Sequence, residues 1–443
     1  MIESDAFKLL LINLFHLNPD DIANIFCTTF NKMMVLLVTL ADKHQACPYC
    51  GFTAPKIKEY VTKEITHSAL TTQKCIIKYR ARRYKCPCCG KTYYEFNPFV
   101  FKSQKISILT VHNILKDLKD FNETFTSVAR RYHVSPTSVS TIFDNHVDIG
   151  RNPLPEIINF DEVYAFKSEK SKYVCVLLDF KKQIPVDVLP NRKKEYLLNY
   201  FQKIPLEERK KVKYACSDMY EVYRDVVHKV FPCSCMLLDY FHLSQDFHRK
   251  MNEVRIKVMK GYKDDKASDE YYLLKKFNWL LFKNPEDEDK YGRLFDVERE
   301  RKYNSHFKSY MNYYDLRRKL LEINNDLTIC YSLKLELVDF YSKSTIDNAQ
   351  VNLEHLIRSC IDTNIEEMIA FSNNLINWKQ EIINSFTIVG TEYKVEADKG
   401  QVVVCNKKVN NAIIENRNKI IKCIKNNANG YTNWSRFRNR VMY

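Results

Sequence analysis

The chain has 443 residues, with 69 Lys and Arg against 54 Asp and Glu, and a formal net charge of +15. Apolar residues make up 45% and charged residues 28%, which is typical of globular domains and excludes a disordered or fibrous chain. The basic excess favours a polyanionic partner, of which nucleic acid is the usual one, over a merely basic soluble protein.

Several function classes are disfavoured by motifs that the sequence lacks. No two of the eight glycines have phosphate-loop spacing, which argues against a P-loop nucleotidase and a GxGxxG dinucleotide fold. Neither GxSxG nor HExxH occurs, so a serine hydrolase or a zinc protease is not expected. The longest apolar run, 33–41, is far below the ~20 residues that cross a bilayer. Without a signal-peptide pattern, we expect a cytoplasmic protein with reduced cysteines.

The first predicted domain spans residues 1–101 and contains two CxxC pairs, each followed by glycine. Cys47 and Cys50 form the first pair, and Cys86 and Cys89 the second. This spacing lets two thiolates hold one side of a tetrahedral zinc, and glycine permits the tight turn beneath it. Residues 74–85 alternate as in a strand. We therefore predict a zinc ribbon with an inserted hairpin, in which Cys88 is not a ligand.

A helix-turn-helix is predicted within residues 102–150. Val128 and Ala129 lie on one helix, and a second helix begins at Pro136 with Ser135 as its cap. A plain helical hairpin is the alternative. In a DNA-binding unit, the second helix would enter a groove. The candidate DNA contacts on these helices are Thr137, Ser138, Ser140, Arg130 and Arg131.

Residues 151–250 read as three strands, a helix, a strand, a helix and a strand, the element order of an RNase H-like α/β core. The first strand, 157–160, is predicted to end at Asp161, and the fourth, 212–216, leads to Asp218. These strands are neighbours in that fold, so the two carboxylates would lie together. Glu162 is a rival of Asp161.

The region 251–395 shows helical periodicity and is predicted to be an all-helical insertion. In residues 396–443, a helix carries Glu415, for which Glu366 and Glu367 are rivals. The basic, aromatic tail would either clasp DNA phosphates through Arg436, Arg438 and Arg440 or pack against the catalytic core. The overall expectation is a multidomain α+β protein.

Two aspartates and a glutamate form an oxygen-rich site suited to Mg²⁺ or Mn²⁺. A two-metal site of this kind activates the attacking oxygen and stabilises the leaving 3′-oxygen in phosphoryl transfer. The attacking group is either water, which cuts DNA, or a DNA 3′-hydroxyl, which joins strands.

The chain resembles the bacterial insertion-sequence transposases of the DDE type, specifically the "ISL-three" family. The matching stretches occur in the family's order and cover nearly the whole chain: CPYCG with RRYKCPCCG, SVARRYHVSPTSV, NFDEVYAFK, VDVLPNR, CSDMYEVY, LLDYFHL, IENRNKIIK and GYTNWSRFRNR. Asn416 stands where the family commonly has glycine, whereas Asn418 and Lys422 match.

This resemblance implies a catalytic triad of Asp161, Asp218 and Glu415, with Asp239 and His242 supporting the site or contacting the scissile phosphate. It implies that the zinc ribbon and the helix-turn-helix recognise the terminal inverted repeats of the element. Double-stranded DNA, both ends and target, is then the partner of a bacterial, nucleoid-associated protein. Bringing two ends together requires a homodimer or a higher assembly.

Two other functions are compatible with parts of this pattern. One is a DNA-binding regulator that kept the zinc ribbon and the helix-turn-helix without catalysis. The other is a nuclease that cuts and never joins, which would share the triad. The retained acidic residues speak against the regulator.

Overall fold

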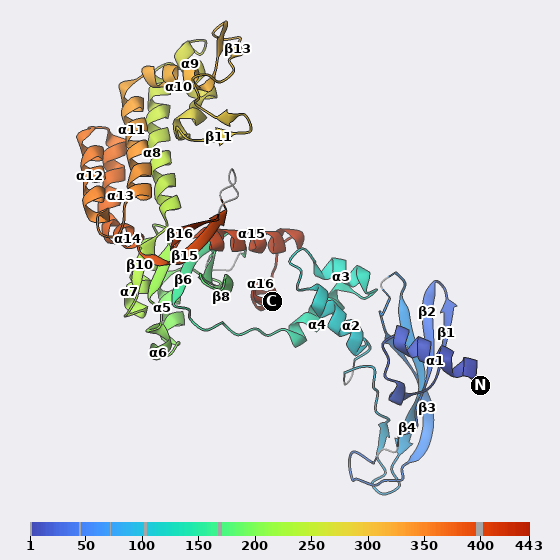
Figure 1. The fold of residues 1–443 in the computed structure, drawn as a ribbon. Helices are drawn as coiled ribbons and strands as arrows, with labels where there is room; N and C mark the ends of the chain where they lie inside the picture. The colour runs from blue at the N-terminus through green and yellow to red at the C-terminus, as the bar shows by residue number, and fades with distance from the viewer. Residues whose placement is uncertain (1, 44–45, 71, 102–103, 167–170, 396–401) are drawn as a thin grey trace. The chain divides into compact units, whose positions relative to one another are not determined.

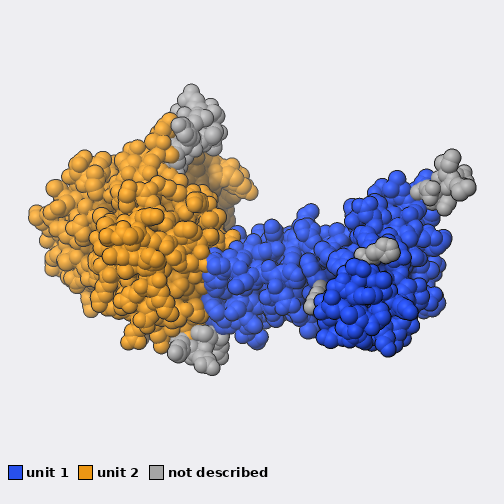
Figure 2. All heavy atoms as spheres, turned by 90° about the horizontal axis from the view of Figure 1, so that it is seen from below, with its two compact units in different colours: residues 1–150, 164–167, 419–443 blue, residues 151–163, 168–418 orange. Residues whose placement is uncertain are grey.

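A computed structural model describes residues 2–43, 46–70, 72–101, 104–166, 171–395 and 402–443 (Figure 1). The chain forms two compact units, coloured separately in Figure 2. Unit 1 comprises residues 1–150, 164–167 and 419–443, and unit 2 comprises residues 151–163 and 168–418. The domain boundaries expected at 101/102 and 395/396 adjoin residues outside the described part. Among the described residues, no helix is long and apolar enough to span a membrane.

Unit 1 begins with α1 (Ile2–Leu14) and a five-stranded sheet. The strand order is β1-β2-β4-β3, with β5 beside β4. The bounds are β1 Ile22–Phe30, β2 Met33–Leu40, β3 Lys56–Thr66, β4 Cys75–Lys85 and β5 Thr92–Tyr94. The antiparallel pair β3–β4 lies between the two CxxC motifs, as predicted, and Cys75 is a buried strand residue. Helix α1 and the strands β1 and β2 were not predicted.

Unit 1 also contains three short helices, α2 (Ile108–Asp117), α3 (Phe125–Arg131) and α4 (Pro136–His146). Ser135 caps α4 by accepting a hydrogen bond from the Ser138 amide, and Pro136 occupies its first turn, as predicted. Val128, Val139 and Phe143 are fully buried between the helices. The C-terminal helix α16 (Trp434–Met442) packs on the same core, where Tyr443 contacts Phe143 edge to face.

Unit 2 is built on a five-stranded mixed sheet with the order β10-β9-β6-β7-β8. Strands β6, β9 and β10 are parallel, whereas β7 is antiparallel to both β6 and β8. The bounds are β6 Ile157–Val163, β7 Val174–Asp179, β8 Ile184–Leu189, β9 Tyr214–Ser217 and β10 Cys235–Leu238. Helices α5 (Lys194–Gln202) and α7 (Glu221–Val230) bury Leu197, Phe201 and Val227 against it, and the short α6 (Leu206–Arg209) connects α5 to β9.

The sheet is followed by a helical assembly with one apolar core, which runs from yellow-green to orange in Figure 1. Its helices are α8 Tyr240–Lys260, α9 Asp269–Lys276, α10 Tyr313–Glu322, α11 Asn325–Lys343, α12 Ala349–Asp362, α13 Glu366–Asn377 and α14 Lys379–Asn384. The region is not all-helical, which corrects the prediction. Two small hairpins interrupt it, β11–β12 (Glu288–Asp289, Gly292–Arg293) and β13–β14 (Lys302–Asn304, Ser309–Met311). Gly292 has a φ of +95°, a turn conformation that ends helical periodicity.

Two further elements precede the C-terminus of unit 2. β15 (Ile388–Val395) and β16 (Val402–Lys408) form an antiparallel pair. β15 lies within the region predicted to be all-helical, so it was missed. Helix α15 (Ala412–Asn427), which carries Glu415, follows.

Candidate metal and nucleic-acid sites

Three aspartates are brought together by the register of the parallel strands in unit 2. Asn159 of β6 pairs with Cys216 of β9, so Asp161 and Asp218 each lie two residues beyond a paired position. Ser217 of β9 pairs with Leu238 of β10, so Asp218 and Asp239 each lie one residue beyond a pair. Because these strands run in the same direction, all three carboxylates emerge at one edge of the sheet.

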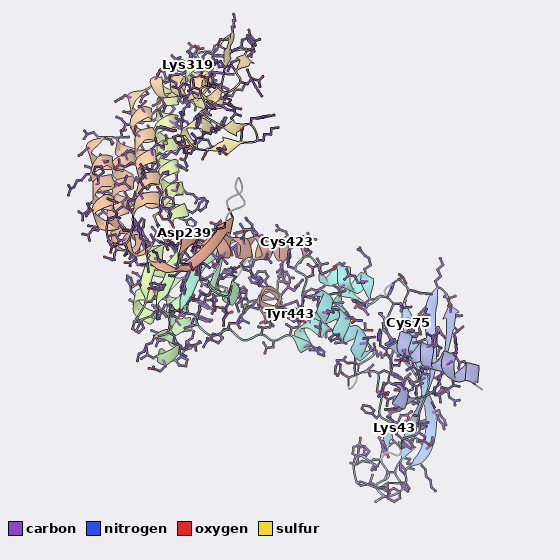
Figure 3. All side chains as sticks on the ribbon, viewed as in Figure 1. Lys43, Cys75, Asp239, Lys319, Cys423 and Tyr443 are labelled. Carbon is purple, nitrogen blue, oxygen red and sulfur yellow. The ribbon has the colours of Figure 1, made fainter. Side chains whose placement is uncertain are left out.

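Asp239 and His242 are joined by the start of α8, where Figure 3 labels Asp239. Asp239 is the N-cap, and its side chain accepts a hydrogen bond from the Phe241 amide. His242 follows three residues later, in the first turn, where an i, i+3 pair lies on the same side of a helix. The Asp-x-x-His spacing therefore directs both side chains to the strand edge.

Glu415 reaches the same place because asparagines fix the start of α15 on β6. The Asn159 amide donates to Asn411 Oδ1 at 2.6 Å and to the Asn410 carbonyl at 2.8 Å. Asn411 in turn donates to the Phe160 carbonyl at 3.4 Å. Nearly two turns into the helix, Asn418 donates to Asp161 Oδ2 at 2.7 Å. The face that carries Glu415 and Asn418 is thereby turned toward Asp161.

Asp239, His242 and Glu415 each offer a ligand atom within 4.8 Å of the other two. Asp239 Oδ2 and His242 Nε2 are 3.8 Å apart, and neither has a hydrogen-bond partner among the described residues, although both atoms are buried. Asp218 Oδ1 is also buried and has no hydrogen-bond partner among the described residues. Buried polar atoms normally find partners, so these three atoms are candidates for coordinating a cation.

The electrostatics of the cluster fit the same interpretation. Burial raises the pKa of Asp161 to about 7; the charges of Asp218, Glu415 and Asp239 add to this shift, and His242 opposes it. The pKa values of Asp218 and Asp239 are also raised, in both cases chiefly by burial. Carboxylates held this close repel one another until a cation or protons neutralise them.

The structure separates Asp161 from its rival Glu162. The Glu162 carboxylate forms an ion pair with Arg192 and accepts a hydrogen bond from the buried Tyr223 hydroxyl at 3.0 Å. Asp161 instead faces the acidic cluster. The prediction that the strand ends at Asp161 is wrong, because pairing with β7 continues from Asp161–Val176 to Val163–Val174 after the described pairing with β9 has ended at Asn159.

The rivals of Glu415 lie elsewhere in unit 2. Glu366 and Glu367 are in the first turn of α13, and their carboxylates lie 4.0 and 3.7 Å from Lys257 of α8. Neither is among the residues that converge at the strand edge.

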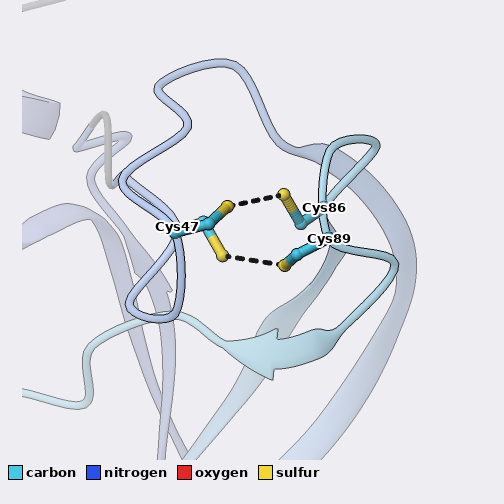
Figure 4. A group of neighbouring side chains, drawn as sticks. Cys47, Cys86 and Cys89 are labelled. Atoms are coloured by element: carbon cyan, nitrogen blue, oxygen red, sulfur yellow. Dashed lines mark hydrogen bonds between the residues drawn. The ribbon is translucent and has the colours of Figure 1, made fainter.

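A second cluster, in unit 1, consists of Cys47, Cys50, Cys86 and Cys89, whose sulfur atoms all lie within 4.8 Å of one another. Figure 4 shows the side chains turned inward from two loops. Cys47 and Cys89 Sγ are 3.7 Å apart, and Cys50 and Cys86 Sγ are 3.5 Å apart. Tetrahedral zinc with ~2.3 Å bonds to sulfur requires about 3.8 Å between sulfurs.

Local backbone geometry supports this thiolate cluster. Gly51 and Gly90 have φ values of +75° and +70°, as predicted for the turn after each pair. A backbone amide hydrogen bond from Cys89 is the largest effect on Cys86 and lowers the pKa of its thiol to about 7. Cys88 is exposed and outside the cluster.

The candidate DNA contacts of unit 1 differ in their availability. Thr137 and Arg130 are exposed and Ser138 is half-buried, whereas Ser140 is buried and donates to the Thr137 carbonyl. Arg131 pairs with Asp117 and Glu123.

The tail arginines are engaged within unit 1. Arg436 pairs with Asp144, and Arg438 donates to the Ile149 carbonyl. Arg440 is buried and donates to backbone carbonyls of residues 118, 120 and 123. Phe437 is buried and stacks on Phe166, also of unit 1.

Some residues that build the site were not predicted. Asn159 and Asn411 are 252 positions apart, and no spacing rule connects them. Asn418 was noted only as a match to the family motif. A polar residue inside the apolar strand 157–160 was the one available signal for Asn159.

Comparison with known proteins agrees with this architecture. Residues 158–397 match the model of a family described as "Transposase", the ISL-three type of DDE transposases. The chain is also 20% identical, over 392 residues, to the transposase for insertion sequence element IS1001 of Bordetella parapertussis, covering 88% of this chain and 86% of that protein. Since the family match spans more than half of the chain, the protein belongs to the ISL-three family of DDE transposases.

Proposed function

We propose that this transposase binds the terminal inverted repeats of an insertion sequence and catalyses metal-dependent DNA strand cleavage and strand transfer. The observation that carries the proposal is the convergence of Asp161, Asp218, Asp239, His242 and Glu415 at one edge of the sheet, with three buried ligand atoms unpartnered among the described residues. The sheet order, with three parallel strands and an antiparallel hairpin, supports an RNase H-like catalytic core.

In this proposal, the five side chains hold a divalent cation at the strand edge. Carboxylate oxygens suit Mg²⁺ and Mn²⁺, and the imidazole of His242 favours Mn²⁺. When bound, the metal would activate the attacking oxygen and stabilise the leaving 3′-oxygen. Asn418 holds Asp161 in place, and the asparagines at the start of α15 hold Glu415.

Unit 1 would supply the recognition of the DNA ends. The four cysteines would bind a structural zinc, and α3 and α4 would act as a helix-turn-helix that presents Arg130, Thr137 and Ser138. Since Ser140, Arg131, Arg436 and Arg440 are buried or paired within unit 1, they would position these helices. Two protein copies would be needed to bring two ends together.

The test is a cleavage and strand-transfer assay with purified protein, the DNA ends of its own element and Mg²⁺ or Mn²⁺. Metal-dependent cuts at the ends that are lost in Asp218→Asn would support the proposal, and joined products would separate a transposase from a nuclease. Specific binding of the ends without any cutting would favour the regulator instead.

A further inference from the structure

A cationic side chain lies beside the acidic cluster of unit 2 and has no part in holding the metal. Arg192 lies in the loop between β8 and α5, and its side chain is 29% exposed. It forms an ion pair with Glu162. Its charge also acts on Asp218, where it opposes the rise in the pKa of that carboxyl that burial causes.

Two tyrosines hold the guanidinium in place. The Cζ atom of Arg192 lies 4.7 Å from the ring centroid of Tyr173 and 4.8 Å from that of Tyr220. The Tyr220 amide donates to the Asp218 carbonyl at 2.8 Å, which ties one ring to the strand end that carries Asp218. Contacts of this type stabilise a cation and restrict its side-chain rotation.

The guanidinium keeps donors available. It has five N–H groups in one plane, and an ion pair with a carboxylate uses at most two of them, so at least three remain. Among the described residues, Glu162 is its ion-pair partner, and no side-chain hydrogen bond from Arg192 is seen. A rigid, partly exposed guanidinium fork suits the two non-bridging oxygens of a phosphate.

The negative charge of the site provides a reason for a cationic side chain at this position. Four carboxylates, those of Asp161, Asp218, Asp239 and Glu415, converge where a DNA phosphate would have to approach. Their field repels the phosphate, and a fixed cation beside Asp218 offsets that repulsion.

We infer that Arg192 is a phosphate-binding residue of the catalytic site, which contacts a DNA phosphate at or next to the scissile bond and is oriented by Glu162, Tyr173 and Tyr220. The inference rests on the proposed function and assigns a substrate contact within it.

The test combines Arg192 variants with DNA ends in which one phosphate at a time, next to the scissile bond, is replaced by an uncharged methylphosphonate. Single-turnover cleavage is measured with protein in excess. Arg192→Gln is expected to slow cleavage by about 10- to 100-fold, the value of a charge-assisted contact, and Arg192→Lys by less. Mn²⁺ binding should be unchanged in both. The neighbouring exposed Lys193→Gln is the matched control.

At one phosphate position, the methylphosphonate should slow cleavage by the wild-type protein by a similar factor. At the same position it should not slow cleavage by Arg192→Gln any further. The double variant Glu162→Gln with Arg192→Gln removes the ion pair as a whole, so a folding defect caused by an unpaired Glu162 would be recognised. The inference would be overturned if the effects of the methylphosphonate and of Arg192→Gln on the cleavage rate multiplied at every phosphate position tested. It would also be overturned if Arg192→Gln cleaved at the wild-type rate. Either result would leave the proposed function intact. No cleavage by the wild-type protein would overturn both.

Discussion

The two ligand clusters of this protein contrast in how the sequence builds them. The four cysteines of unit 1 come from two motifs only 36 to 42 residues apart, and each motif carries its own turn glycine. The acidic cluster of unit 2 joins residues 161 to 415 and depends on strand register and on an asparagine pair that fixes α15. Local spacing is therefore sufficient for the first cluster, whereas the second exists only in the folded chain.

The clusters also differ in what they do to the protein without metal. The sulfur atoms of the four cysteines lie together beside two local turns. In the acidic cluster, burial raises the pKa values of Asp161, Asp218 and Asp239, and the carboxylates repel one another. We therefore expect loss of a cysteine ligand to destabilise unit 1 of the zinc-loaded protein, and loss of a carboxylate to stabilise unit 2 of the metal-free protein.

The largest expected effect concerns the cysteine cluster. Cys86→Ser should abolish zinc binding and unfold the loops around it, because structural zinc contributes on the order of 10 kcal/mol of binding free energy to such a site. Zinc content measured after gel filtration, with proteolysis of residues 46–95 as a second readout, checks this. Cys88→Ser is the control; if it lost zinc as Cys86→Ser does, the assignment of ligands would be wrong.

The next effect concerns Asp218. Asp218→Asn should lower cleavage on the order of a thousandfold, because it removes a metal ligand. At pH 8 it should also raise the metal-free unfolding free energy by about 1–2 kcal/mol, because a neutral amide relieves the repulsion. Cleavage rates and urea unfolding without divalent metal measure both changes.

Asp225→Asn provides the control for Asp218→Asn. Asp225 is a surface carboxylate paired with Lys194, so its substitution should leave cleavage unchanged and not increase stability. A destabilised Asp218→Asn protein would contradict the picture of a repulsive cluster.

A smaller effect is expected at Asn418, which orients Asp161 through one hydrogen bond. Asn418→Ala should weaken Mn²⁺ binding by about 10- to 100-fold, as is usual for residues that orient metal ligands. Titration calorimetry measures the affinity. The exposed Asn426 on the same helix is the control, and equal affinities for Asn418→Ala and Asn426→Ala would show that this hydrogen bond is not needed.

The smallest effect is a pH dependence. Because the folded-state pKa of Asp161 is raised to about 7 from 3.8, its contribution to stability is fully present below pH 3.8 and is lost as the pH rises through about 7. Between pH 5 and 8, metal-free wild-type protein should lose about 1–2 kcal/mol relative to Asp161→Asn. Thermal unfolding at several pH values tests this, and parallel curves for the two proteins would refute it.

The strands of the five-stranded sheet in unit 2 and the helices that connect them could be predicted from the sequence, because each one is a short apolar run with clear turn residues. The cap of α4 by Ser135 and the turn glycines 51 and 90 were predictable for the same local reasons. The hairpins within 284–311 and the strand β15 were missed, because their strands are short or exposed and lack an alternating apolar pattern.

The candidate site was predicted unevenly. Asp161 and Asp218 follow from the element order, but the resemblance to a family, and not any spacing, brought in Asp239, His242 and the preference for Glu415. The environment of Arg192 could not be predicted, because its partners Glu162, Tyr173 and Tyr220 come from three different segments. The contacts of the tail arginines could not be predicted either, because they depend on the packing of α16 on the short helices of unit 1.

The most direct test of the central claim is Mn²⁺ binding to the zinc-loaded protein, followed by electron paramagnetic resonance. The five-residue cluster predicts bound Mn²⁺ in the wild-type protein, with binding strongly reduced in both Glu415→Gln and His242→Ala and retained in Glu366→Gln. Undiminished Mn²⁺ binding in Glu415→Gln and His242→Ala would contradict the claim that these side chains form the catalytic metal site.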